Sequence, residues 1–118
     1  SRLNMKPKVF AIDIDGVICI TSGSDYNYSK PNYNVIKKIN ALYEKGNKII
    51  IFTARYMGRN NEDIDKVYNT GYAKTKKQID SWGIKYHHLI MGKPSFDIVI
   101  DDKHFNYDDS WKDIDFKK

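Results

Sequence analysis

Two carboxylates stand two residues apart, directly after an apolar run near the start of the chain. The run is Val9–Ile12, and Asp13, Asp15 and Gly16 follow it. A continuous apolar run that ends in acid predicts a buried strand that delivers its carboxylates to the edge of a sheet. Alternate side chains of an extended chain point the same way, so Asp13 and Asp15 can face one ligand, and Gly16 lets the backbone turn close to it. Two carboxylates this close repel each other and need a cation or a shared proton.

Three further apolar runs also end in residues that could do chemistry. They are residues 49–52, followed by Thr53, Ala54 and Arg55; residues 89–91, followed by Gly92 and Lys93; and residues 98–100, followed by Asp101 and Asp102. Short apolar runs bounded by turn residues predict buried strands. Polar groups at the ends of four strands are hard to explain by packing alone, so we expect them to form one site.

Between these runs, apolar residues recur at helical spacing. The pattern predicts a helix that begins at Pro31, with Ser29 as its cap, and stops at Gly46. A second helical stretch covers residues 61–83, where Gly71 leaves open one kinked helix or two shorter ones. A terminal helix over residues 107–116 is also predicted.

Strands that alternate with helices predict an α/β fold: a short parallel sheet with right-handed crossovers and helices on both faces, in three layers of a Rossmann-like domain. Ligands of such sheets bind at the carboxyl ends of the strands. The length of 118 residues, 41% of them hydrophobic, indicates a single domain over residues 1–118. Within it we interpret residues 1–5 as a tail or tag and residues 17–30 as a short flap or hairpin over the site.

The amino-acid composition indicates which cellular compartment and which kinds of partner to expect. Cys19 is the only cysteine, and no stretch has the length of a membrane span or the pattern of a signal segment, so we expect a cytoplasmic protein without a membrane partner. The formal charge is +5, but the lysines are scattered, which disfavours a nucleic-acid partner and suits a small anionic substrate.

Gathered at one edge, these side chains suit metal-assisted phosphoryl transfer. Asp13 and Asp101, with waters, suit Mg²⁺, which prefers oxygen ligands. Asp13 can attack phosphorus and form an aspartyl-phosphate, while Asp15 protonates the leaving oxygen and then activates water. Thr53 and Lys93 can hold the equatorial phosphate oxygens, where charge collects in the transition state.

The same residues, in the same order, resemble the four motifs of the haloacid-dehalogenase-like phosphatases. The motifs here are Asp13-Ile14-Asp15-Gly16-Val17, Thr53 after a hydrophobic strand, Lys93, and Asp101-Asp102. The resemblance implies a phosphatase of that fold whose Mg²⁺ is bound by Asp13, by the backbone carbonyl of Asp15 and by Asp101. It leaves Asp102 beside either a metal-bound water or Lys93. Further contacts to the phosphate or the substrate are assigned to Gly16, Ala54 and Arg55. Arg55 could instead pair with a carboxylate in a structural role, and we favour substrate contact slightly.

Short blocks around these motifs are similar to a subfamily linked to the biosynthesis of capsule and surface polysaccharides. That similarity implies a sugar phosphate or a related small phosphorylated metabolite as substrate. The family usually carries a cap domain, and no segment here is long enough for one. The site is therefore expected to be open, with specificity left to Tyr26 and Tyr28 on the flap, to residues 55–59, or to a second subunit or fused partner domain.

Other functions fit some of these features. A nucleotide or nucleic-acid 3′-phosphatase would suit the basic balance and the open site. A phospho-receiver domain uses similar residues in a different order, and a non-enzymatic binding module would have no need of the intact acids. His87 and His88 are adjacent on a predicted strand and so point to opposite faces, which favours a structural role over a shared metal.

Overall fold

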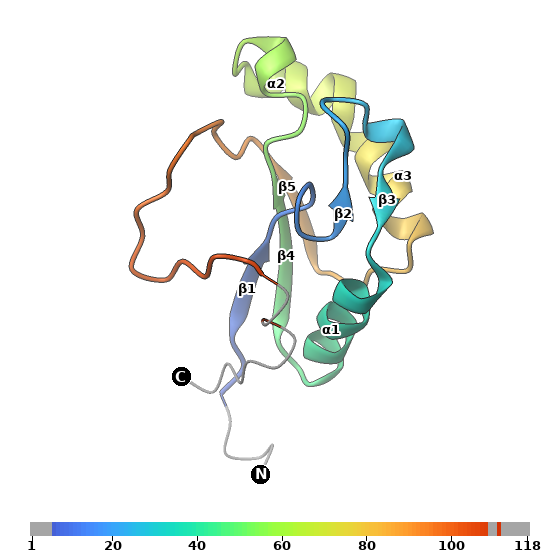
Figure 1. The fold of residues 1–118 in the computed structure, drawn as a ribbon, viewed down its shortest axis with the longest axis vertical. Coiled ribbons are helices and arrows are strands. Elements are labelled where there is room, and N and C mark those ends of the chain that lie inside the picture. The colour runs from blue at the N-terminus through green and yellow to red at the C-terminus, as the bar shows by residue number, and fades with distance from the viewer. Residues whose placement is uncertain (1–5, 109–110, 112–118) are drawn as a thin grey trace.

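Three parallel strands form the central sheet of the computed structural model, which describes residues 6–108 and residue 111. The strands are β1 (Val9–Ile12), β4 (Lys48–Thr53) and β5 (His88–Met91), in the order β1–β4–β5 (Figure 1). Ile12 lies opposite Ile51, and Ile51 lies opposite Leu89, so the three strands end at the same edge. The predicted strands at these three places are confirmed, and so is their parallel arrangement.

One face of the sheet is buried and the other is partly open. Ile49, Ile51 and Thr53 of β4 have no exposed surface, whereas the alternate residues Ile50 and Phe52 are half-buried. In Figure 1, α1 (Tyr33–Glu44) and α3 (Ala73–Ser81) lie on one side of the sheet, and α2 (Ile64–Val67) lies beyond its upper end. Right-handed crossovers that proceed from β1 to β4 to β5 in one direction place both connecting helices on the same face. The predicted helix layer on the second face is therefore not seen in the described part of the chain.

The first connection contains α1 (Tyr33–Glu44), which begins at a polar cap. The side chain of Asn32 accepts hydrogen bonds from two backbone N–H groups of the first turn. The prediction that Ser29 caps this helix is wrong, because the chain between them is the strand β3 (Lys30–Pro31). The predicted stop is confirmed: Gly46 takes a positive φ of 94° two residues after the helix ends.

The second connection is one helical stretch with a wider turn in its middle. Its segments are α2 (Ile64–Val67), the π-helix η4 (Tyr68–Tyr72) and α3 (Ala73–Ser81). Gly71 lies in the π-helical turn, where an added Cβ would stand 2.3 Å from the ring of Tyr56. Glycine is therefore needed there to let the helix approach the chain just after β4.

The flap is a small hairpin packed beside the sheet. It contains β2 (Cys19–Ile20), the 3-10 turn η2 (Tyr26–Tyr28) and β3, and a further 3-10 turn, η3 (Gly58–Asn60), follows β4. Cys19 pairs with Pro31 and Ile20 with Lys30 in antiparallel register, so the hairpin extends one residue beyond the predicted range of 17–30.

The prediction of a fourth strand at residues 98–100 is wrong for this structure. Residues 94–106 are all exposed and contain no helix or strand, and Ile100 is 96% exposed. In Figure 1 this segment leaves the end of β5 as a wide loop on the open side of β1. At its start, the backbone N–H and the hydroxyl of Ser95 donate hydrogen bonds to the carboxylate of Glu62. An apolar run of only three residues can bury little surface against β1, so local pattern alone is a weak reason for a strand there.

The last described residues return to the core. Trp111 is 6% exposed and packs edge-on against the ring of Tyr107, with 5.7 Å between the ring centres. Apart from Trp111 and residues 107–108, the predicted helix at 107–116 lies outside the described residues. Within the described part, no helix has the length and apolar character required to cross a membrane.

Candidate functional site

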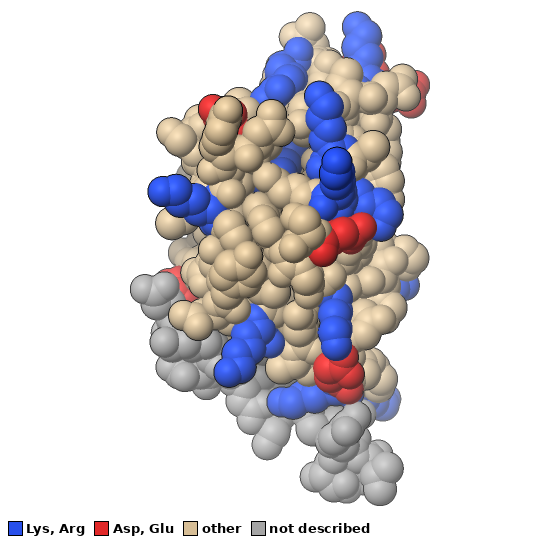
Figure 2. All heavy atoms as spheres, turned by 90° about the vertical axis from the view of Figure 1, so that its right-hand side faces the viewer, with Lys and Arg blue, Asp and Glu red and all other residues tan. Residues whose placement is uncertain are grey.

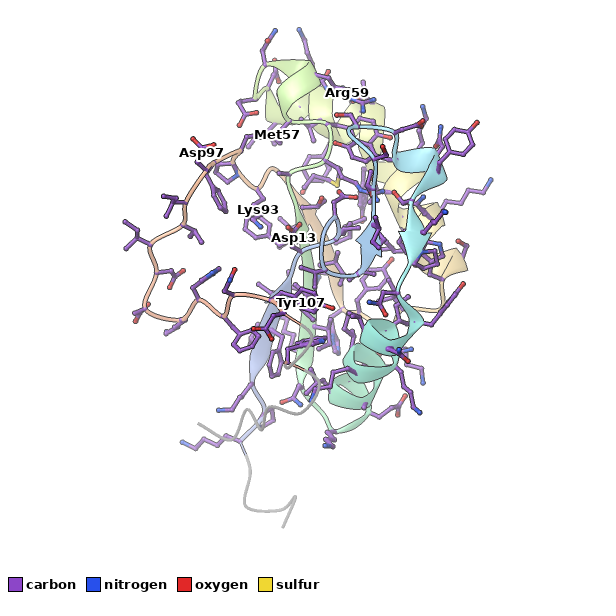
Figure 3. The ribbon with its side chains drawn as sticks, in the orientation of Figure 1. Asp13, Met57, Arg59, Lys93, Asp97 and Tyr107 are labelled. Carbon is purple, nitrogen blue, oxygen red and sulfur yellow. The ribbon has the colours of Figure 1, made fainter. Side chains whose placement is uncertain are left out.

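Asp13 and Lys93 face each other at the carboxyl edge of the sheet. Asp13 follows β1 and Lys93 follows β5, and Figure 3 shows their side chains converging at the ends of these strands. Lys93 Nζ lies 3.4 Å from Asp13 Oδ2, while Asp13 Oδ1 accepts the N–H of Ile14 at 2.8 Å. A carboxylate and an ammonium that are both partly accessible thus meet where a ligand of a parallel sheet would bind.

The end of β4 positions the lysine. The backbone N–H of Lys93 donates to the carbonyl of Thr53 at 3.1 Å, which continues the β4–β5 pairing by one more bond. Gly92 makes the turn between strand and lysine with a positive φ of 91°. Thr53 is fully buried, and its hydroxyl accepts the backbone N–H of Arg55 at 3.0 Å. Two predicted phosphate ligands, Thr53 and Lys93, are thereby joined through the backbone.

Asp15 is held by a buried arginine. Arg55 Nε donates to Asp15 Oδ2 and Arg55 Nη2 donates to Asp15 Oδ1, both at 2.9 Å. The hydroxyl of Thr21 also donates to Asp15 Oδ1. Arg55 is only 2% exposed, and its remaining donors reach Gln78 and Ser29. Of the two roles predicted for Arg55, the structure shows the pairing with a carboxylate rather than the favoured contact with substrate, because its guanidinium is committed within the protein.

Burial and neighbouring groups shift the pKa values of Asp13 and Asp15 in opposite directions. Burial raises the pKa of Asp13, and the ammonium of Lys93 offsets only part of that rise. Burial also raises the pKa of Asp15, but the hydrogen bonds from Arg55 and Thr21 outweigh it and hold that pKa below its ordinary value. The two acids at the end of β1 thus differ in proton affinity, and Asp15 is the one held in its ionised form.

Two smaller residues were also predicted to contact phosphate. Gly16 takes a positive φ of 87°, and its N–H donates to the carbonyl of Cys19 at 2.9 Å. That N–H is engaged in the turn, so the role of Gly16 here is to shape the loop after β1. Ala54 is half-buried between Thr53 and Arg55, and its carbonyl accepts the N–H of Met57.

The acid pair of the predicted fourth strand lies outside this cluster. Asp101 and Asp102 are exposed, and Asp101 accepts the backbone N–H of Lys103, which lowers the pKa of Asp101. Among the described residues, no group of three or more His, Cys, Asp or Glu gathers as a metal site. The expected convergence of Asp101 with Asp13 is therefore not present, because the strand that should deliver Asp101 is not formed.

Sequence reasoning missed the polar residues that surround Asp15. Thr21 and Ser29 bond each other and the Asp15–Arg55 pair, and Gln78 reaches both Arg55 and the carbonyl of Tyr26. Thr21 and Ser29 resemble ordinary turn residues, and Gln78 stands among lysines on a polar helix. A buried arginine that needed partners was the one signal that could have pointed to them.

Charge on the surface is spread out. Figure 2 shows Lys and Arg distributed over one face of the molecule, with no continuous basic stripe. Nucleic-acid-binding proteins often carry such a stripe or patch.

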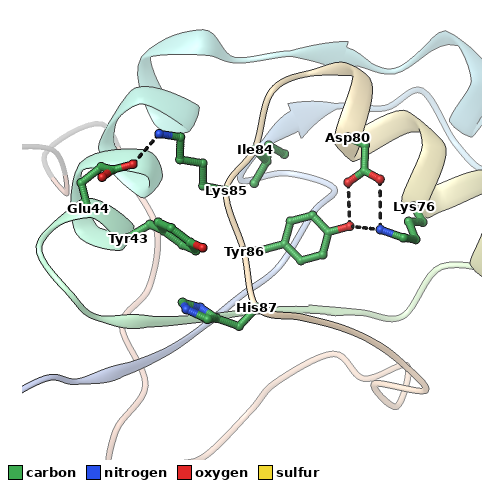
Figure 4. Close-up of a pocket in the computed structure, with 8 residues that line it drawn as sticks. All are labelled: Tyr43, Glu44, Lys76, Asp80, Ile84, Lys85, Tyr86 and His87. Carbon is green, nitrogen blue, oxygen red and sulfur yellow. Dashed lines mark hydrogen bonds and ion pairs between the residues drawn. The ribbon is translucent and has the colours of Figure 1, made fainter.

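A second hollow lies at the opposite end of the sheet. It has a volume of about 470 Å³ and is lined by Tyr43, Glu44, Lys76, Asp80, Ile84, Lys85, Tyr86 and His87 (Figure 4). Its charged groups bond one another, Lys85 to Glu44 and Lys76 to Asp80. His87 stacks on Tyr43 and accepts the N–H of Ile49, in agreement with its expected structural role.

Comparison with known proteins gives the fold and no activity. No family model matches the chain, and no curated protein matches it. The structure is similar to the crystal structure of a structural-genomics target from Vibrio cholerae. The TM-score is 0.70 at 25% sequence identity, over 86% of this chain and 80% of that chain. The chain is thus a mixed α/β domain with a short parallel sheet, an arrangement that it shares with a solved protein.

Proposed function

We propose that the chain is a phosphatase that hydrolyses a phosphomonoester through an aspartyl-phosphate on Asp13. The observation that carries the proposal is the pair formed by Asp13 and Lys93 at the carboxyl edge of a parallel sheet, with Asp15 two residues further on. The resemblance of these residues to the motifs of the haloacid-dehalogenase-like phosphatases supports it, and that family's fold is part of the proposal.

Asp13 is the nucleophile. One of its carboxylate oxygens bonds to phosphorus while the bond from phosphorus to the leaving oxygen breaks, and water later cleaves the acyl phosphate. Lys93, 3.4 Å from Asp13, would contact the transferring phosphoryl group and offset its charge. Thr53 fixes the backbone that carries Lys93. The proposed bond from its hydroxyl to a phosphate oxygen requires that this buried hydroxyl become accessible when substrate binds.

Asp15 transfers the proton in both steps. As placed, its carboxylate is the ionised form that accepts a proton from the attacking water. The acid role requires Asp15 to take up a proton, and the negative charge of an arriving phosphate favours that uptake, because a nearby like charge raises a carboxyl pKa. The leaving oxygen then receives this proton as it departs.

Mg²⁺ is the proposed cofactor, and the described residues form only part of a site for it. Asp13 and Asp15 stand at the end of β1, while Asp101 is exposed on the segment 94–106. The cation would be held by the carboxylate of Asp13, the backbone carbonyl of Asp15 and Asp101, once that segment lies along β1. It would offset repulsion between the acids and neutralise phosphate oxygens.

The proposed substrate is a small phosphorylated metabolite such as a sugar phosphate of surface-polysaccharide biosynthesis, and the proposed compartment is the cytoplasm. The spread of basic charge in Figure 2 favours a small anion over a polynucleotide. The site would be open, with the flap or a second subunit limiting the leaving group.

The test is phosphate release from a panel of sugar phosphates, nucleotides and oligonucleotide 3′-phosphates, with and without Mg²⁺. We expect Mg²⁺-dependent release from a small phosphomonoester that disappears in Asp13→Asn. Asp65→Asn, which makes the same change on the exposed side of α2, is the matched control. Full activity in Asp13→Asn would refute the proposal, and a stable phosphoprotein without turnover would favour a receiver domain.

A further inference from the structure

The guanidinium of Arg55 joins four parts of the molecule beneath the site. Arg55 lies just after β4, and its guanidinium donates one hydrogen bond to each carboxylate oxygen of Asp15, a bidentate pair called the fork below. Each bond is 2.9 Å long. Paired parallel bonds of this kind fix the plane of a carboxylate as well as its distance, which a lysine cannot do. The fork is buried on the arginine side, so water does not compete for it.

The remaining contacts of Arg55 hold the flap and α3. Its Nη1 donates to Gln78 Oε1 at 2.6 Å, and Gln78 Nε2 donates to the carbonyl of Tyr26 at 2.7 Å. Its Nη2 also reaches the hydroxyl of Ser29 at 3.2 Å, and its Cζ lies 4.6 Å from the centre of the Tyr26 ring. Both ends of the η2 segment are thus attached to the group that holds Asp15.

We propose that Arg55 is a positioning residue that aims one oxygen of Asp15 at the leaving group and ties that aim to the flap. The proposal rests on the phosphatase function above and deepens it. It replaces the expected contact between Arg55 and substrate with an action through Asp15.

The hydrogen bonds of Asp15 indicate which of its two carboxylate oxygens carries the proton. A carboxylate oxygen has two lone pairs, and those of Asp15 Oδ1 are taken by Thr21 Oγ1 and Arg55 Nη2. Asp15 Oδ2 accepts from Arg55 Nε and, among the described residues, keeps its second lone pair. The proton therefore travels on Oδ2. It passes to the leaving oxygen as that oxygen's bond to phosphorus breaks, and the electron pair of the O–H bond stays on Oδ2.

Lys37 offers a control for the loss of a surface cation. It is exposed on α1, which carries neither Asp15, Arg55 nor Gln78. Lys37→Gln therefore removes a positive charge without changing the hydrogen bonds of Asp15.

The experiment compares two substrates whose leaving groups differ in their need for a proton. Departure of p-nitrophenolate needs little protonation, whereas an alkoxide from glycerol phosphate needs a full proton. The measured quantity is kcat/KM, which reports events up to the first irreversible step, in the wild type, Arg55→Lys and Lys37→Gln. We expect Arg55→Lys to lower kcat/KM for the alkyl phosphate about tenfold to a hundredfold more than for the aryl phosphate. Lys37→Gln should leave the ratio of the two unchanged within about twofold.

A double-mutant cycle separates positioning from general loss of structure. In the Asp15→Asn background there is no proton to aim, so Arg55→Lys should change the substrate ratio no further. If Arg55→Lys does not fold, Gln78→Ala keeps the fork, frees Arg55 Nη1 and should shift the ratio in the same direction by less.

Equal losses on both substrates, or an unchanged ratio with Gln78→Ala when Arg55→Lys does not fold, would overturn the proposal. Such a result would still leave Asp13-dependent hydrolysis in place, so it differs from the failure of the phosphatase function itself.

Discussion

The carboxyl edge of the sheet and the segment 94–106 both carry residues suited to chemistry, but only the first is held in place. At the edge, Thr53 is fully buried and Arg55 is 2% exposed, and backbone pairing continues as far as Lys93. Along the segment every residue is exposed, and Asp101 bonds the backbone of its near neighbour Lys103.

The difference shows what a strand end contributes to a site. Asp13, Asp15 and Lys93 are placed because neighbouring strands fix their backbones, and the buried fork from Arg55 then fixes one side chain further. The acidic residues of the segment 94–106 are also carboxylates, but no neighbouring strand pairs with their backbones. Residue type therefore suggests a reaction, and backbone pairing decides which residues can take part together.

The largest expected effect separates the two regions by stability. Ile51→Ala removes a fully buried side chain between β1 and β5 and should lower the free energy of unfolding by about 2–5 kcal/mol. Ile100→Ala, at a position that is 96% exposed, should change it by no more than about 0.5 kcal/mol. Urea unfolding without Mg²⁺ measures both. Similar losses of unfolding free energy at the two positions would mean that the segment packs on the sheet in solution. They would contradict the contrast between the two regions.

A smaller effect tests whether the segment joins the site during turnover. Asp101→Asn should raise the Mg²⁺ concentration needed for half-maximal activity by at least about tenfold, the scale seen when metal-site residues are altered. Asp97→Asn makes the same change on the same exposed segment and should leave that concentration unaltered. Titration of activity with Mg²⁺ checks both variants, and identical curves for the two would exclude Asp101 from the metal site.

The smallest expected effect is a pH dependence of folding stability, which arises from Asp15 at the carboxyl edge of the sheet. The folded pKa of Asp15 lies below the ordinary value of 3.8, so its ionised form stabilises the fold above that pH. This contribution is lost as the pH falls through the folded pKa. Asp15→Asn should therefore lower stability most near neutral pH, and the loss should shrink toward about pH 3. Urea unfolding across that range checks the trend, and a loss that grows on acidification would reverse the assigned sign.

Much of the fold could be predicted from local pattern. The runs that became β1, β4 and β5 are apolar and bounded by turns, and Gly46 and Asp63 mark helix ends by their own backbone chemistry. The cap of α1 was misplaced because Ser29 and Asn32 are both good caps, and only the pairing of β3 with β2 decides between them.

The candidate site also has one part that could be predicted from the sequence and one part that could not. The gathering of Asp13 and Lys93 at one edge was predicted from the strand ends, whereas the ion pair between them was not. The role of Arg55 depends on Gln78 and Ser29, which approach from a helix and a flap far away in sequence. The exposed course of residues 98–100 could not be predicted, because the local pattern of this apolar run is like that of the runs that form strands.

The most direct test of the account is to locate the phosphoryl group on the chain. Asp15→Asn, which slows the water step, is mixed with Mg²⁺ and p-nitrophenyl phosphate, quenched in acid and examined by peptide mass spectrometry. The account predicts one phosphoryl group on the peptide that contains Asp13, and none in the Asp13→Asn, Asp15→Asn double variant. Turnover of the substrate with no phosphorylated Asp13, or with the phosphoryl group on another residue, would contradict it.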